Sequence, residues 1–323
     1  MNEASPVESA VVEPAPETPS SRLPPPLKKF FSTTRGKAIA VVVILVVLLG
    51  VAGQQVYARP VDDPFVRTMV SIFPFPALSV NGTTVTMKEY LTEYDALKKY
   101  FDGQGADAPP ADELETAIAD TLTNKVAIRQ LAQARGIEID QARVEKYYQD
   151  VIASQESEEA FVQDLDDTFG WSVEEFKSRV VESIVLALQM SEVILADNAL
   201  QQPRRDTIDA ADARVLAGED FAAVAKEVNA GFEAGLEADL GYVKLSIIPP
   251  SWASAVDALS IGSMTEVLDL PEGYAVFKAE DRTESDEDTQ IHLLSITVPK
   301  MTLEEVVKGY LASVEVKRYV GEI

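Results

Sequence analysis

An uncharged, strongly apolar segment near the N-terminus constrains the architecture of this chain more than any other feature. No charged residue occurs in Ala38–Ala58, and the centre of the segment is almost entirely Val, Ile and Leu. As a helix it would span about 32 Å, which matches the roughly 30 Å hydrocarbon core of a bilayer. A helix without a polar face has no side to present to water. The sequence therefore predicts one transmembrane helix over residues 38–58.

Charges on either side of this segment predict its orientation. The residues ahead of it include Lys28, Lys29, Arg35 and Lys37, whereas Asp62 and Asp63 follow it. Positive residues favour the cytoplasmic side, so we expect a single-pass cell-membrane protein with a cytoplasmic N-terminus and residues 59–323 outside the cytoplasm. A cleaved signal peptide ending at Val56–Ala58 stays open as an alternative, although residues 1–37 make an unusually long leader.

Composition excludes several classes of function. The chain has 323 residues, enough for two modest domains, with no Cys and one His. These counts argue against disulfides, a thiol nucleophile and Cys-rich zinc sites, so we expect no metal and no cofactor. The 53 acidic residues outnumber the 28 basic ones, for a formal net charge of −25. Nucleic-acid binding depends on cationic side chains, so we expect no nucleic-acid partner.

Local patterns divide the rest of the chain. We expect a Pro-rich disordered tail over 1–37, a stalk over 59–77 and a helical domain over 78–200 that opens with an Asn81–Gly82 turn. Three Ser/Thr-x-x-Glu patterns predict capped helix starts, the second of them beginning a long helix that runs toward Ala199. These pairs are Thr86 with Glu89, Ser172 with Glu175, and Thr302 with Glu305.

Two segments of the helical domain carry a family resemblance. They read LTNKVAIRQLAQARGIEIDQARVEKYYQDV (residues 122–151) and FVQDLDDTFGWSVEEFKSRVVESIVLALQM (residues 161–190). In this order they resemble the N-terminal chaperone lobe of SurA/PrsA-type foldases. The resemblance implies an all-helical lobe that binds unfolded polypeptides.

The following region resembles a parvulin-type peptidyl-prolyl isomerase domain. The matching pieces are AGEDFAAVAKEV, ADLGYV, PPSWASAVDALSIGSMTEVL and EGYAVFKAED, all within residues 217–281. The resemblance implies an α+β domain with an antiparallel sheet, which we expect over residues 206–299. It also implies binding of proline-containing polypeptides and rotation about the bond preceding proline, which breaks no covalent bond.

The resemblance also implies a proline-binding cup formed by four residues of this chain. Ile248 and Trp252 fall at an apolar and an aromatic position of the cup, with Leu240 and Met264 nearby in the pattern. We expect these four residues to bind substrate. Ile248, Leu240 and Met264, each taken singly, are also explained as ordinary core residues.

The polar positions of the parvulin pattern are altered, which leaves the catalytic residues unassigned. Ala275 stands where the family has a histidine in its last strand, and only Asn229–Gly231 lies near the family's Cys or Asp position. The family's first strand is absent before Ala210, and residues 290–298 are expected to replace it in a circularly rearranged sheet. The family's first strand usually contains another histidine, and Ser295 would then occupy the position of that histidine. His292, the sole histidine, is either a site residue or a half-exposed strand residue.

The C-terminal segment and the acidic connector complete the prediction. Residues 284–288 read as a solvated loop rather than a cation site, because their carboxylates lack the spacing of a ligand loop. Residues 300–323 contain an amphipathic helix. The family resemblance implies that this helix returns to the helical lobe and leaves the isomerase domain as an insertion.

Three functional interpretations follow from these features. The first is a membrane-anchored extracytoplasmic foldase that holds unfolded secreted or envelope proteins, with a parvulin-like domain of reduced or lost activity. The second is an active peptidyl-prolyl cis-trans isomerase. The third is a non-catalytic membrane scaffold for one dedicated partner.

Overall fold

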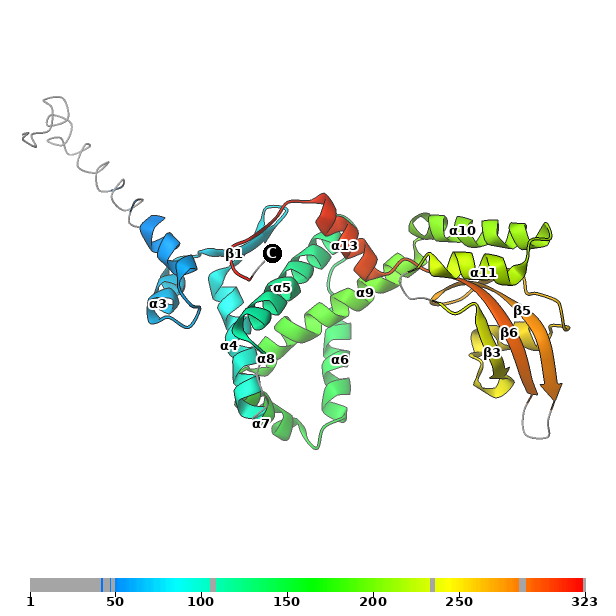
Figure 1. The fold of residues 1–323 in the computed structure, drawn as a ribbon. Coiled ribbons are helices and arrows are strands. Elements are labelled where there is room, and N and C mark those ends of the chain that lie inside the picture. Colours follow the sequence, from blue (N-terminus) through cyan, green and yellow to red (C-terminus); the bar gives the residue numbers. More distant parts are fainter. Residues whose placement is uncertain are drawn as a thin grey trace, which may run out of the picture. The chain divides into compact units, whose positions relative to one another are not determined.

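A computed structural model describes residues 50–104, 109–232, 236–284 and 289–321, together with residues 42 and 47 (Figure 1). The chain divides into two compact units, Met1–Ile72 and Phe73–Ile323. The tail predicted over 1–37 and most of the predicted membrane segment lie outside the described residues. Among the residues that are described, no helix is both long enough and apolar enough to cross a membrane.

The described part of the first unit is helical and held by short-range ion pairs. Residues 50–58 are helical, and α3 (Pro64–Ile72) follows after a short turn. Arg59 Nη1 lies 3.3 Å from Asp63 Oδ2, and Arg67 Nη2 lies 2.8 Å from Asp62 Oδ1. The two aspartates that follow the apolar run are therefore each paired with a nearby arginine.

A small antiparallel sheet opens the second unit. β1 (Pro76–Val80) and β2 (Thr83–Thr86) pair across Asn81 and Gly82, whose φ angles of 46° and 81° are positive, as a tight hairpin turn of this type requires. The predicted turn is confirmed. The third strand is β7 (Val316–Arg318), which pairs with β1 and gives the order β2-β1-β7. The sequence did not predict β7, because a three-residue strand is too short to show alternation.

Successive helices form the helical lobe. Their bounds are α4 (Met87–Gln104), α5 (Ala111–Ala134), α6 (Gln141–Ala153), α7 (Glu158–Phe169), α8 (Val173–Phe176) and α9 (Glu182–Ala196). The capping box predicted at Ser172 is confirmed: its Oγ accepts from the backbone N–H of Glu175 at 3.2 Å, and the Glu175 carboxylate accepts from the backbone N–H of Ser172 at 3.0 Å.

The long helix predicted from Ser172 toward Ala199 is confirmed over residues 173–196, but it contains a π-helical turn and ends before Ala199. Residues Lys177–Val181 form a π-helical turn between α8 and α9. Helix α9 stops at Ala196, and the Asp197 side chain caps a new helix, α10 (Asn198–Leu216). A π-helical turn inserts one residue without a polar break, so the apolar spacing of the sequence does not reveal it.

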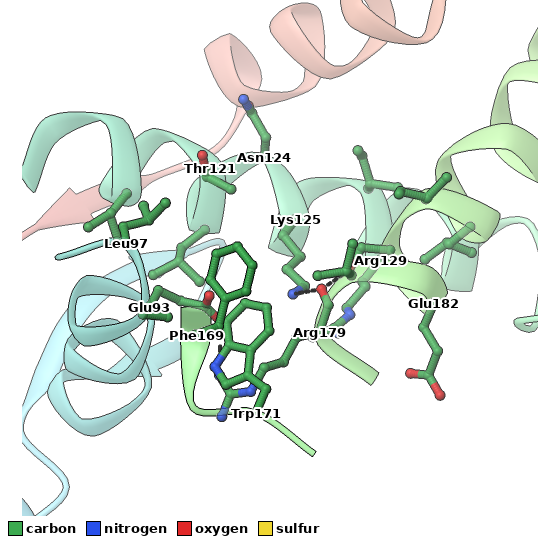
Figure 2. A pocket seen from close by; sticks show the side chains of 18 of the residues that line it. Glu93, Leu97, Thr121, Asn124, Lys125, Arg129, Phe169, Trp171, Arg179 and Glu182 are labelled. Carbon is green, nitrogen blue, oxygen red and sulfur yellow. Dashed lines mark hydrogen bonds and ion pairs between the residues drawn. The ribbon is translucent and has the colours of Figure 1, made fainter. Parts of the chain in front are cut away.

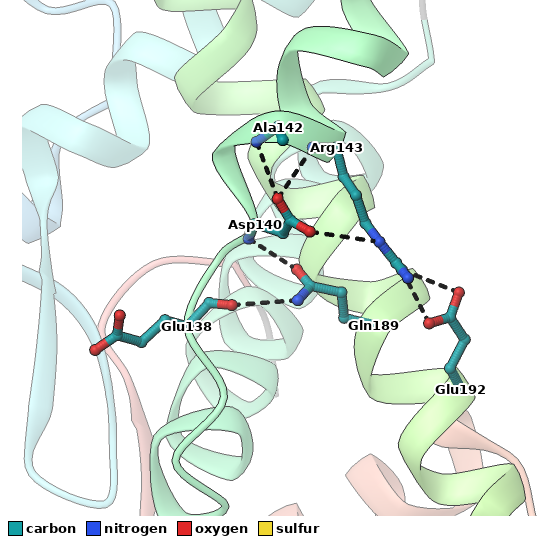
Figure 3. Close-up of polar contacts among 6 residues, drawn as sticks. All are labelled: Glu138, Asp140, Ala142, Arg143, Gln189 and Glu192. Carbon is teal, nitrogen blue, oxygen red and sulfur yellow. Dashed lines mark hydrogen bonds and ion pairs between the residues drawn. The ribbon is translucent and has the colours of Figure 1, made fainter.

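Polar contacts join the start of α6 to the middle of α9 (Figure 3). The Asp140 carboxylate accepts from two backbone amides in the first turn of α6 and so caps this helix. Arg143 Nη1 donates to both carboxylate oxygens of Glu192, at 3.0 and 2.9 Å. The Gln189 side chain accepts from the Asp140 N–H at 3.1 Å and donates to the Glu138 carbonyl at 3.2 Å. These contacts fix the chain between α5 and α6 against α9.

The C-terminal helix completes the core of the helical lobe. α13 (Leu303–Ser313) begins at the predicted capping box of Thr302 and Glu305. Its Val307 is buried in one cluster with Leu131 of α5 and Met190 of α9, and Figure 1 shows α13 beside these two helices. The predicted return of the C-terminal helix is therefore confirmed.

The remaining elements form an antiparallel sheet with helices on both faces. The strands are β3 (Asp239–Lys244), β4 (Leu268–Asp269), β5 (Gly273–Glu284) and β6 (Thr289–Pro299), in the order β3-β6-β5-β4. The helices are α10, α11 (Phe221–Ala230) and α12 (Pro250–Asp257). The strand predicted at residues 290–298 is thus central, and it pairs with β3 on one side and β5 on the other. The mixed α+β architecture and its antiparallel sheet agree with the prediction.

Alternation along β5 and β6 sorts their side chains onto the two faces of the sheet. Val276 and Ile296 lie in the buried cluster that includes residues of α10 and α11. Phe277 and Leu293 lie in a second buried cluster with Val256 of α12. Because both faces are covered, buried apolar residues of β6 occur at both alternating sets of positions, as Leu293 and Ile296 illustrate.

Ile296→Ala is expected to lower the free energy of unfolding by about 2–5 kcal/mol, because it opens a cavity in a fully buried position of the central strand. Ile247, which is 70% exposed, offers a matched control in the same domain. Ile247→Ala should change stability by less than about 0.5 kcal/mol. Urea unfolding followed by circular dichroism measures both, and equal losses would contradict the central position of β6.

Candidate functional site

The face of the sheet covered by α12 holds most of the residues singled out by sequence. The helix starts at Pro250, a favoured first-turn residue. It lays Trp252 flat on Phe277 of β5, with ring centroids 4.3 Å apart and an interplanar angle of 11°. One face of the indole is therefore covered by Phe277, and the half-buried ring keeps part of its surface in contact with solvent.

The structure brings together only two of the four residues expected to bind substrate. Ile248, which is 5% exposed, and Trp252 belong to the same cluster on the α12 face. Met264 packs against the cluster on the α10–α11 face, and Leu240 is exposed on edge strand β3. The assignment of these four residues to substrate binding stays a prediction.

The two altered polar positions are buried on the same face as Trp252. Ala275 is 1% exposed and lies opposite Thr297 in the ladder, whereas Ser295 is 2% exposed and lies opposite Phe277. The Ser295 hydroxyl donates to the carbonyl of Glu237 at 3.1 Å. Ala275 has no polar side chain, and the one donor of Ser295 is already used by the backbone. Neither residue offers a free donor to a bound amide.

Asn229, from the segment near the family's Cys or Asp position, has a structural role. Its side chain is buried at the end of α11. The amide nitrogen donates to the carbonyls of Ser295 at 3.0 Å and Glu237 at 3.3 Å, and the amide oxygen accepts from the N–H of Thr297 at 2.9 Å. These contacts satisfy two backbone groups of β6 that β3 does not reach and connect that strand to Glu237.

His292 lies in the central strand β6, between β3 and β5. Its ring stacks on Tyr242 with centroids 5.1 Å apart, and Nε2 lies 2.8 Å from Asp239 Oδ1. A backbone hydrogen bond from Gly241, followed by the contact with His292, holds the pKa of Asp239 below its ordinary value. His292 alternates with Leu293, so it is not on the α12 face. The sole histidine therefore contributes nothing to the face that carries Trp252.

A second candidate site is a cavity of about 560 Å³ in the helical lobe, here named the helical-lobe cavity (Figure 2). It lies among α4, α5, the α7–α8 connection, the π-helical turn and α9. Its volume falls in the range of small-ligand pockets. Its apolar lining residues include Leu97, Ile118, Leu122, Ile128, Val180 and Ile184.

Two aromatic rings form one wall of the helical-lobe cavity. Gly170 ends α7 in the left-handed region with a φ of 74°, which reverses the chain between Phe169 and Trp171. Their rings stack with centroids 5.0 Å apart, and Tyr100 of α4 stacks on the other side of Phe169 at 5.6 Å. The Arg179 guanidinium lies 5.7 Å from the Trp171 ring. The wall is thus a rigid aromatic stack.

Charged groups meet beside this wall. Arg179 Nη1 lies 3.0 Å from Glu93 Oε1, while the Arg179 carbonyl, in the π-helical turn, accepts from Lys125 Nζ at 2.8 Å and from the Ser183 hydroxyl at 3.0 Å. Burial lowers the pKa of Lys125; Glu93 opposes this shift, while Arg129 and Arg179 add to it. The ammonium group is therefore held in an unfavourable environment.

Sequence reasoning did not identify the helical-lobe cavity. Trp171, Arg179 and Lys125 all lie in the two segments that carry the foldase resemblance, but the sequence patterns assigned them only to generic helices. The Phe-Gly-Trp triplet is the signal that could have found them. Aromatic residues on both sides of a glycine that ends a helix do not belong to the apolar stripe of that helix. They must therefore pack against another part of the chain.

A comparison with known protein families matches one part of the chain. Residues 195–289 match the family described as the PPIC-type PPIASE domain. The chain contains a PPIC-type domain. The matched segment ends where β6 begins, so the strand that completes the sheet lies almost wholly outside the match.

Two curated relatives are named Chaperone SurA. The protein from Aromatoleum aromaticum is 25% identical over 244 residues, covering 64% of this chain and 56% of that protein. The protein from Xanthomonas axonopodis pv. citri is 25% identical over 132 residues, covering 40% and 28%. The matched part of the chain thus spans about half the length of the first relative and less than a third of the second. The family match and these relatives confirm the predicted resemblance to this group of foldases.

A solved structure was also compared with the chain. The crystal structure of the foldase protein PrsA from Lactococcus lactis aligns with 14% identity and a TM-score of 0.24, covering 74% of this chain and 84% of that chain. A score this low supports no structural argument.

Lys125→Met is expected to raise the free energy of unfolding at pH 7. Because the pKa of Lys125 is lowered in the folded chain, the charged form opposes folding at all pH values below that pKa. This destabilisation by the charged lysine declines as the pH rises through the folded pKa, and it vanishes above the ordinary pKa of 10.5. Methionine retains apolar packing, and Ser183 still donates to the Arg179 carbonyl.

Urea unfolding at pH 7 and at about pH 10 measures this effect. The increase in the free energy of unfolding caused by Lys125→Met should be smaller at the higher pH. The exposed Lys98 of α4 provides the control, and Lys98→Met should change stability little. A less stable Lys125→Met protein at pH 7 would show that the hydrogen bond to Arg179 outweighs the cost of burial.

Proposed function

We propose that this chain is a foldase-type chaperone that binds unfolded polypeptides, and that its PPIC-type domain binds proline-containing segments without accelerating their isomerisation. One observation carries the proposal. The α12 face retains an aromatic and apolar surface around Trp252, while the polar positions on that face are Ala275 and a Ser295 hydroxyl already bonded to a backbone carbonyl. The surface suits binding and lacks the free donors that catalysis needs.

Energetic reasoning separates binding from catalysis on this face. Rotation about a peptide bond has a barrier of about 18–20 kcal/mol, and each tenfold acceleration requires roughly 1.4 kcal/mol of stabilisation specific to the twisted amide. Polar groups aimed at that amide would have to supply it. An aromatic ring over the proline stabilises the cis and trans forms alike and so lowers no barrier.

The helical-lobe cavity supports the chaperone part of the proposal. Its aromatic wall and apolar lining can receive a side chain that an unfolded polypeptide exposes. Aromatic rings contribute large contact area at low conformational cost. The similarity to proteins named Chaperone SurA favours the same use.

The location of the protein is part of the proposal. The apolar run Ala38–Ala58 and the change from basic to acidic flanking residues favour a membrane anchor with a cytoplasmic N-terminus. Residues 59–323 would then meet secreted or envelope proteins after these cross the membrane. A scaffold for one dedicated partner is the competing interpretation, and it predicts binding to a single protein rather than to many unfolded chains.

Suppression of aggregation tests the proposed function. The full chain in lipid nanodiscs should reduce light scattering when several unrelated, guanidinium-unfolded proteins are diluted into buffer, because apolar segments are held before they associate. Empty nanodiscs are the control. No protection of any client would contradict chaperone function, and protection of only one would favour the dedicated scaffold.

A second experiment measures the affinity of the full chain for proline-containing peptides and compares it with that of Trp252 variants. Trp252→Ala should weaken peptide binding to the PPIC-type domain by about thirtyfold, the usual scale for losing a buried aromatic anchor. Trp252→Phe, which keeps a ring over Phe277, should weaken binding much less. Unchanged affinity in a folded Trp252→Ala protein would show that Trp252 is only a core residue.

A further inference from the structure

The cationic residues of the helical-lobe cavity are incompletely neutralised. Lys125 and Arg129 lie one turn apart on α5, and both line the cavity. Within the described ranges of the chain, neither forms an ion pair, and the hydrogen bond of Lys125 goes to an uncharged carbonyl. Such a pair of cations is unexpected in a chain with a net charge of −25.

Two acidic residues that line the cavity do not remove this imbalance. Glu93 is paired with Arg179 at 3.0 Å. The Glu182 carboxylate points away from Lys125 in Figure 2, and its charge, which raises the pKa of Lys125, is the weakest of the charge effects on that group. A lysine ammonium has three donors, so Lys125 retains donors for a bound acceptor after its bond to Arg179. The cavity therefore combines an apolar interior with an available cationic edge.

The shape of the surface indicates how a ligand would lie. A second hollow of about 670 Å³ adjoins the cavity. The residues common to both linings are Glu93, Leu122, Lys125, Arg129, Arg179 and Glu182. The lining that belongs only to the second hollow is mostly polar, including Thr86, Glu89 and Ser178. Lys125 and Arg129 thus stand at the junction of an apolar and a polar hollow, as an extended chain crossing from one to the other would require.

We propose that the helical-lobe cavity selects polypeptide segments in which an aromatic or large aliphatic side chain is followed by a carboxylate. The apolar side chain enters the cavity beside Phe169 and Trp171, and the carboxylate binds Lys125 and Arg129. This inference rests on the proposed binding of unfolded polypeptides and names the sequence class that the helical lobe prefers. The carboxylate can belong to Asp, to Glu or to a chain terminus.

Physical chemistry favours a carboxylate over other acceptors at this junction. Hydrogen bonds between an ionised donor and an ionised acceptor are about twice as strong as neutral ones. Arginine offers a fork of donors that matches the two oxygens of a carboxylate. The preference should weaken as the salt concentration rises, because the edge of the cavity is open to solvent.

Intrinsic fluorescence can report on this cavity alone. The chain has two tryptophans, so a Trp252→Phe background leaves Trp171 as the single indole, in the wall of the cavity. The full chain in nanodiscs is titrated with the blocked peptides acetyl-Ala-Leu-Phe-Glu-Ala-amide and acetyl-Ala-Leu-Phe-Gln-Ala-amide. The Glu peptide should bind about tenfold more tightly than the Gln peptide at low salt.

Three variants locate the preference. Lys125→Gln and Arg129→Gln should each remove most of the difference between the two peptides. Lys98→Gln removes one positive charge from the exposed surface of α4, outside the cavity lining, and should leave the difference unchanged. If Lys125→Gln does not fold, as judged by circular dichroism, the exposed Arg129 still provides the test.

A second peptide pair distinguishes the source of the carboxylate. Acetyl-Ala-Leu-Phe with a free C-terminus is compared with its amide, and a preference for the free acid would show that a chain terminus is also accepted. Equal affinities within both peptide pairs would overturn the carboxylate preference, even if every peptide binds. Absence of any Trp171 response alongside normal suppression of aggregation would overturn the cavity as the site and leave the proposed chaperone function intact.

Discussion

The pairing of β6 with β5 and β3 is the interaction on which the rest of the sheet domain depends. β6 is central, and its register with β5 runs from Gly273 opposite Pro299 to Glu284 opposite Thr289. This register determines which side chains reach each face. It places Phe277 and Ser295 beneath α12, and it sets Val276 and Ile296 beneath α10 and α11. A shift by one residue would exchange the apolar contents of both clusters.

The same strand also determines how the domain joins the helical lobe. The chain leaves β6 at Pro299 and enters α13 through Met301 and Thr302. Gln201 of α10 is buried at this connection, where it exchanges hydrogen bonds with the backbone of Met301 and donates to the carbonyl of Ile194 at 2.9 Å. Arg204 Nη2 lies 2.6 Å from Glu305 Oε1 beside it. One buried amide thus ties the outgoing and returning segments together, and leaving it unpaired would carry the full cost of a buried polar group.

Features with a local physical cause were predictable from the sequence. The capping boxes at Ser172 and Thr302 and the turn at Asn81 depend on side chains within a few residues of each other. β6 was recognisable from its length and its β-branched residues, and the family resemblance indicated its place in the sheet. The π-helical turn and β7 were not predictable. Neither leaves a periodic signal, and β7 forms only through pairing with a strand more than 200 residues earlier.

The candidate sites divide in the same way. The resemblance located Trp252, but tertiary packing decided that Met264 faces the other cluster and that Ser295 donates to a backbone carbonyl. The wall formed by Phe169 and Trp171 depends on the reversal at Gly170 and on stacking with Tyr100, which lies in a different helix. Contacts of this kind between distant segments are set by the fold and have no signature in the local sequence.

Binding without catalysis is the central claim, and exchange spectroscopy on a peptide containing one Phe-Pro bond tests it most directly. With the full chain in nanodiscs at increasing concentration, the proline resonances should broaden or shift as the peptide binds. The account predicts that the cis-trans exchange rate of the peptide stays equal to the rate without protein, because neither Ala275 nor Ser295 offers a free donor to the twisted amide. An exchange rate that rises in proportion to the protein concentration would contradict the account.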